Sequence, residues 1–117
     1  MAVETAITLI IGADQQLVID VVDADGLPQV QTGWAEQFVL RSTDGRLVAN
    51  KASGGSGVTI GNGAGTNTRA TIELADTDTV GWAAGRAYEW AHWRTDDGTD
   101  VPLAYGQATL VKVAAQV

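Results

Sequence analysis

"AGRAYEWAHWRTDDGTD", residues 84–100, is the stretch on which the interpretation of the whole sequence depends. It holds the only histidine of the chain, two of its four tryptophans and one of its two tyrosines. Gly85 precedes the aromatic part, and Asp97-Gly98 follows it as a typical turn pair. We therefore expect one β-strand over residues 86–95 that runs into a hairpin turn, rather than a cluster assembled for catalysis.

The strand over residues 86–95 should have one inward and one outward face, because alternate side chains of a strand point to opposite sides. One face carries Tyr88, Trp90 and His92, and the other carries Ala87, Glu89, Ala91 and Trp93. We expect Tyr88 and Trp90 to point inward, in an arrangement that matches the tyrosine corner of β-sandwiches. Trp93 then lies outward beside Glu89, where it suits docking of a protein and could equally stack on a sugar.

Short apolar runs with a period of two recur along the chain, separated by turns rich in Gly, Asp, Asn and Thr. The expected strands cover residues 5–11, 16–23, 34–42, 46–51, 58–60, 68–74, 86–95 and 101–113. Residues 76–82 should form one helical turn, capped by Asp76 or Thr77 and ended by Gly85. Seven or eight strands with almost no helix predict an all-β fold, either an antiparallel immunoglobulin-like sandwich or a small barrel.

The length of 117 residues predicts a single domain over residues 1–117, large enough to bury a core without disulfides. The chain has no cysteine, which excludes disulfides, thiolate metal sites and a cysteine nucleophile. The glycine-rich region 54–65 is expected to be a loop within this domain. Residues 114–117 are expected to form a tail.

The net charge of −7 argues against nucleic acid as a partner, because phosphate binding requires a surface rich in Lys and Arg. No basic segment precedes an apolar one at the start of the chain. "AITLII", residues 6–11, is also too short for a signal peptide core or a membrane span. We therefore expect a protein that is made and used in a cytoplasm, or exported by a route that needs no cleaved signal, without a membrane partner.

The sequence around the serines argues against a catalytic role for the single histidine. His92 could in principle activate Ser42, Ser53 or Ser56. "GGSGV", residues 54–58, is not the Gly-x-Ser-x-Gly motif, however, and does not join a strand to a helix. We expect a protein that is not an enzyme.

Metal and cofactor motifs fail in the same way. "DVVDADG", residues 20–26, lacks the ligand spacing of an EF-hand, which leaves at most a weak calcium site at a strand end. "GNGAG", residues 61–65, precedes a predicted strand, whereas a dinucleotide-binding motif requires a helix there. We expect neither a metal centre nor a cofactor.

Several motifs occur in a fixed order along nearly the whole chain. The first half contains "ITLIIGADQQLVIDVVDADGLP" and "VQTGWAEQFVL", and the second contains "ADTDTV", "AGRAYEW", "DDGTD" and "YGQATLV". This order resembles the immunoglobulin-like module of tailed-bacteriophage virion proteins, typified by the N-terminal domain of upper baseplate proteins. The residues that carry the resemblance are framework positions, namely Gly12, Asp25, Gly26, Pro28, Gly33, Gly85, Tyr88, Gly98 and Gly106.

The resemblance implies a non-enzymatic virion protein that is assembled in the host cytoplasm and docks on other virion proteins. We expect a capsid decoration protein bound to the major capsid protein, with Trp93 and Glu89 at the docking surface. A symmetric homo-oligomer is compatible with this role. A tail or baseplate component is the alternative within the same class. A carbohydrate-binding module that uses Trp93 to recognise host-surface glycans is the alternative from another class.

Overall fold

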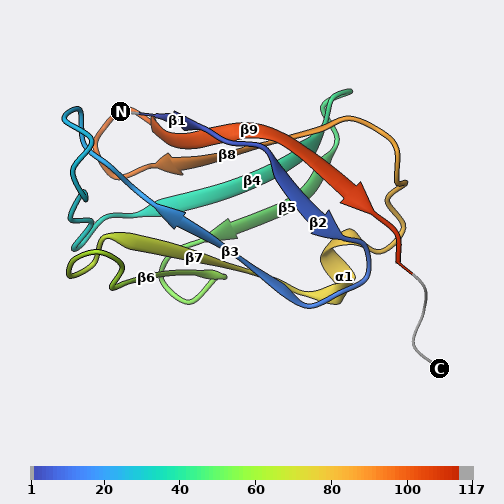
Figure 1. Ribbon diagram of the computed structural model, residues 1–117, viewed down its shortest axis with the longest axis horizontal. Coiled ribbons are helices and arrows are strands. Elements are labelled where there is room, and N and C mark those ends of the chain that lie inside the picture. Colours follow the sequence, from blue (N-terminus) through green and yellow to red (C-terminus); the bar gives the residue numbers. More distant parts are fainter. Residues whose placement is uncertain (1, 114–117) are drawn as a thin grey trace.

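Two β-sheets pack face to face in the computed structural model, which describes residues 2–113 (Figure 1). The elements are β1 (Val3–Glu4), β2 (Ile7–Ile10), β3 (Gln15–Asp20), β4 (Glu36–Ser42), β5 (Leu47–Ala52), β6 (Val58–Gly61), β7 (Arg69–Leu74), α1 (Asp76–Thr79), β8 (Tyr88–Arg94) and β9 (Val101–Val111). The larger sheet has the order β1-β9-β8-β4-β5, with β2 also paired to β9, and the smaller has the order β3-β7-β6. The predicted all-β sandwich is confirmed.

The strand order is that of an immunoglobulin-like domain. In that fold strands C, F and G share one sheet, and strands B and E pair in the other. Here β4, β8 and β9 take the first three places, and β3 and β7 take the other two. The β4–β5 and β8–β9 hairpins lie where the turn sequences predict them. The predicted tail, residues 114–117, lies outside the described residues.

The first strand departs from the expected antiparallel pattern. β2 lies within the predicted strand over residues 5–11, β1 precedes it as an additional short strand, and both run parallel to β9 along one edge of the larger sheet (Figure 1). Val3 lies opposite Ala104 and Ile7 lies opposite Ala108, so one register continues across the break. The described residues therefore form nine strands instead of seven or eight. Alternation reports which face of a strand is buried, but it carries no information about the direction of the neighbouring strand.

The break between β1 and β2 lies against Gly106 of β9. A Cβ atom at Gly106 would lie 2.0 Å from the carbonyl oxygen of Thr5, so this close approach requires glycine. The indole Nε1 of Trp90 donates a hydrogen bond to the same oxygen at 3.0 Å. Gly106 thus has a packing role at the edge of the larger sheet.

The predicted helical turn is present but shorter than expected. α1 ends at Thr79, and Val80 already has extended backbone angles, with φ −61° and ψ 137°. The cap also differs from the prediction, because the Asp78 carboxylate accepts a hydrogen bond from the Ala75 amide at 2.7 Å. Gly85 lies in the turn before β8 and does not end the helix.

The core between the sheets is built from alternate residues of the strands. Phe38 and Leu40 of β4 and Ile72 of β7 are fully buried. Phe38 also stacks on Trp90 of β8, with ring centroids 6.0 Å apart. These contacts hold β4 and β8 in the centre of the larger sheet and thereby determine which side chains point outward on its other face.

Four of the other framework residues carried over from the resemblance shape turns. Gly26, Gly85 and Gly98 have φ values of 77°, 77° and 74°, a region that favours glycine. Pro28 forms an isolated antiparallel bridge with Val22, which closes the loop after β3. These four residues determine the path of the chain between strands.

Candidate functional site

The inward face of β8 is structural. Tyr88 is 1% exposed, and its hydroxyl donates a hydrogen bond to the Ala83 carbonyl oxygen at 2.7 Å. The ring of Trp82 packs edge-on against Tyr88, with centroids 6.2 Å apart. This is the predicted tyrosine corner, and together with the buried Trp90 it confirms which face of β8 points inward.

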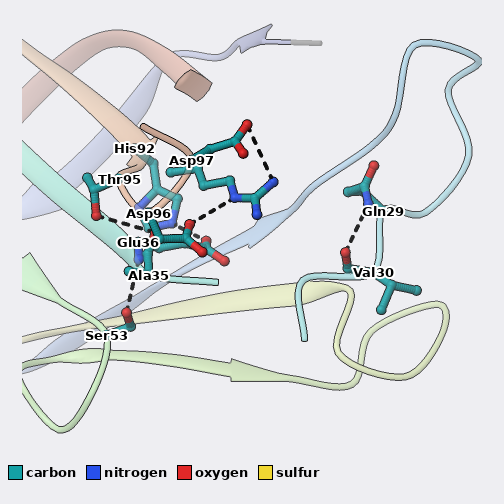
Figure 2. Close-up of polar contacts among 10 residues, drawn as sticks. Gln29, Val30, Ala35, Glu36, Ser53, His92, Thr95, Asp96 and Asp97 are labelled. Atoms are coloured by element: carbon teal, nitrogen blue, oxygen red, sulfur yellow. Dashed lines mark hydrogen bonds and ion pairs between the residues drawn. The ribbon is translucent and has the colours of Figure 1, made fainter. Parts of the chain in front are cut away.

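His92, the third residue of this face, is buried against an acidic side chain. Its Nε2 lies 2.7 Å from Glu36 Oε1, and both side chains are fully buried (Figure 2). The Glu36 amide donates to the hydroxyl of Ser53, the residue after β5, at 2.9 Å, which ties the start of β4 to the end of the β4–β5 hairpin. Sequence reasoning missed this pair, although Glu36 shares its alternation phase with Phe38 and Leu40 and so belongs to the inward face.

The histidine therefore lies in the core rather than in a cleft. None of the three candidate serines, Ser42, Ser53 and Ser56, hydrogen-bonds to it among the described residues. Glu36 Oε2 and His92 Nδ1 have no hydrogen-bond partner within residues 2–113. The pair holds β4 to β8 beneath the outer face, while the absence of enzymatic activity stays a prediction.

The outer face of the larger sheet carries a groove of about 740 Å³. Its centre is Ala91 of β8, which lies opposite Val39 of β4 on one side and Tyr105 of β9 on the other. Glu4 of β1 continues this row beyond Tyr105. The groove exists because alanine is much smaller than its neighbours, so the row is hollow over β8.

Trp93 and Glu89 lie at the two ends of this hollow, each two residues from Ala91. Both line the groove, Trp93 half-buried and Glu89 exposed, as their predicted outward orientation requires. Trp93 lies opposite Pro102, and Glu89 lies opposite Arg41. The two residues predicted for docking thus share one concave surface, while their role in docking stays a prediction.

Tyr105 also lines this groove, although the sequence analysis did not predict it as a site residue. It is 42% exposed, and its alternation in "LAYGQ", residues 103–107, could have indicated an outward position. Its place beside Ala91 could not have been predicted, because the register of β8 with β9 shifts between His92 and Trp93.

Two further tryptophans are covered by arginines of the same chain. The Arg94 guanidinium lies 4.0 Å from the centroid of Trp34, and the Arg46 guanidinium lies 5.0 Å from that of Trp82. Arg94 also donates to Asp96 at 2.9 Å, and this hydrogen bond lowers the pKa of the Asp96 carboxyl. Cation–π stacking on exposed indole faces is therefore a recurrent arrangement in this molecule.

The described residues contain no candidate metal centre and no helix that could cross a membrane. Within residues 2–113, no group of three or more His, Asp or Glu side chains is placed to hold a metal ion. The single short helix of this region lacks the length and apolar composition of a membrane-crossing segment. Comparison of the chain with protein-family models and with curated proteins finds no match.

Proposed function

We propose that this protein is an accessory structural protein of a bacteriophage virion, and that it docks on another virion protein through the groove over Ala91. The proposed position is on the capsid, as a decoration protein bound to the major capsid protein. The observation that supports docking is a concave surface with a half-buried Trp93 and an exposed Tyr105 around one small residue. Exposed aromatic side chains around a hollow are typical anchors of protein interfaces.

The fold supports this proposal independently of the groove. An immunoglobulin-like sandwich is the fold that the resemblance to virion modules implies. Gly106, one of the residues that carry the resemblance, is required in this chain by the close approach of Thr5. The net charge of −7 favours a neutral or basic docking surface on the partner.

One substitution tests whether docking uses the groove. Ala91→Tyr should fill the hollow and reduce association with particles that lack this protein by at least about tenfold, because the anchor pocket is lost. Association is measured by co-sedimentation of the purified protein with such particles. Thr71→Tyr is the matched control, since Thr71 is the corresponding outward residue of the central strand of the smaller sheet. If particles bind neither the parent protein nor the control, the virion role is wrong.

Electron microscopy of the loaded particles then separates the two locations. Extra density on the capsid lattice supports decoration, whereas density confined to the tail supports the baseplate alternative.

A carbohydrate-binding role is the second candidate, favoured by one observation. Trp93 and Tyr105 both project from neighbouring strands beside Ala91, and two aromatic rings beside a hollow suit stacking on sugar rings. Titration of host cell-wall oligosaccharides, followed by tryptophan fluorescence, tests it. A saturable change that Trp93→Ala removes would support this role over protein docking.

A further inference from the structure

The half-buried tryptophans of the chain differ in what covers them. Trp34 is covered by Arg94 and Trp82 by Arg46, each from within the chain. Trp93 is half-buried like these two, yet no arginine or lysine of residues 2–113 stacks on its ring. Trp93, which lines the groove, is therefore the half-buried tryptophan whose ring has no cation from residues 2–113 stacked on it.

The carboxylates of the groove are also without partners. Within residues 2–113, Glu4 and Glu89 take part in no ion pair. By contrast, Asp44, Asp78 and Asp96 each pair with a basic side chain.

Arg41 is the basic side chain of the groove lining, and it is engaged elsewhere. It lies opposite Glu89 across β4 and β8, but its Nη1 donates to the Gly45 carbonyl oxygen at 3.2 Å, in the β4–β5 turn. The lining thus contains two carboxylates and one guanidinium, in a chain whose net charge is already −7. Charge complementarity favours a cationic occupant.

We propose that the groove receives an arginine side chain presented by the partner protein. The guanidinium would lie over Ala91, stack on Trp93 and donate hydrogen bonds to Glu89. Ala91 is two residues, or about 6.6 Å of strand, from each of them, so one planar group at the centre is within reach of both side chains. This inference rests on the proposed docking function and names the chemistry of its partner.

Arginine fits this site better than lysine or a neutral side chain. A guanidinium is planar, so it can stack on an indole and still direct several N–H groups toward a carboxylate in its own plane. Glu4, beyond Tyr105 in the same row, offers a second carboxylate to the flanking backbone or to a second basic residue of the partner.

The test uses two blocked tripeptides of nearly the same shape, one with a cationic guanidinium and the other with a neutral urea group in its place. Acetyl-Gly-Arg-Gly-amide and its citrulline counterpart are titrated into the full chain, and the indole N–H signal of Trp93 is followed by NMR. The arginine peptide should shift this signal with a dissociation constant in about the millimolar range, and the citrulline peptide should bind at least about fivefold more weakly. Equal responses to both peptides, or no response to either, overturn the inference.

Two variants test the role of the carboxylate. Glu89→Gln should weaken binding of the arginine peptide about fivefold, because it removes the charge and keeps the shape. Glu73→Gln is the control, since Glu73 lies on the outer face of the smaller sheet and accepts a hydrogen bond from Gln16. Unchanged binding by Glu89→Gln overturns the inference.

The particle assay separates failure of this inference from failure of the docking proposal. If Ala91→Tyr abolishes particle association while Glu89→Gln and added salt leave it unchanged, docking through the groove is supported. The inference that the groove receives an arginine side chain is then wrong. If the peptides bind selectively but Ala91→Tyr still associates with particles, the arginine site stands and docking uses another surface. A response of Trp93 to oligosaccharides with none to the arginine peptide favours the carbohydrate role.

Discussion

The outer faces of the two sheets share the same strand geometry but differ in how their polar groups are satisfied. On the smaller sheet, Arg69 of β7 donates two hydrogen bonds to Asp20 of β3, at 2.8 and 3.2 Å. On the same face, Gln16 donates to Glu73 across the same pair of strands. On the larger sheet, the groove carboxylates form no such cross-strand pair among the described residues.

The central residues of the two faces differ as well. Thr71 is β-branched and lies between Val18 and Thr59, so the middle of the smaller sheet is filled. Ala91 leaves the middle of the larger sheet hollow. The smaller sheet thus pairs charged groups across its outer face, whereas the hollow of the larger sheet combines unpaired carboxylates with aromatic side chains, the features on which the docking proposal rests.

The largest loss of stability is expected when the buried Glu36–His92 pair beneath the groove of the larger sheet is broken. Glu36→Ala should lower the free energy of unfolding by about 3 kcal/mol, because it leaves the buried His92 without its partner. Urea denaturation measures the change. The double variant Glu36→Leu with His92→Leu should be less destabilising than Glu36→Ala alone, since no buried polar group is then left unpaired. A loss below about 1 kcal/mol for Glu36→Ala would show that the pair does not support the sheet.

A smaller effect is expected at the edge of the larger sheet, where Glu4 enters the groove. Gly106→Ala should lower the free energy of unfolding by about 2 kcal/mol, because the new methyl group would push Thr5 away from β9. Hydrogen exchange of the Thr5 amide, which donates to the Tyr105 carbonyl oxygen at 2.9 Å, should also become faster.

Gly61→Ala provides the control for this substitution on the smaller sheet. A Cβ atom at Gly61 would meet no heavy atom within 4 Å. Equal losses of stability for the two variants would contradict the special role of Gly106.

The smallest effect is expected for an ion pair on the face of the smaller sheet. The hydrogen bond from Arg69 holds the pKa of Asp20 below its usual value. Because the folded-state pKa is depressed, the pair stabilises the fold above the unfolded carboxyl pKa of about 3.9 and loses this contribution as the pH falls through the folded pKa. Asp20→Asn should therefore lower the urea midpoint slightly at pH 7, and the gap to the parent protein should close at acidic pH. A gap that is independent of pH would contradict the pairing.

Alternation along β8 was sufficient to predict much of the site. It assigned Tyr88 and Trp90 to the core and Trp93 and Glu89 to the outer face. It did not place Tyr105 beside Ala91, because cross-strand neighbours depend on a register that shifts within the β8–β9 pair. It also could not pair Glu36 with His92, which lie on different strands and come together only when β4 aligns with β8.

The sequence by itself determined the all-β class, both hairpins and the two faces of β8, because side-chain period and turn residues are local properties of the chain. The tertiary structure decided that β1 and β2 run parallel to β9, and it decided which residues surround Ala91. The physical reason is that strand direction and register depend on contacts between segments far apart in the sequence. The stretch "AGRAYEWAHWRTDDGTD" supplied Glu89 and Trp93 at the two ends of the groove. Its sides come from Val39 of β4 and Tyr105 of β9, which only the tertiary structure places beside Ala91.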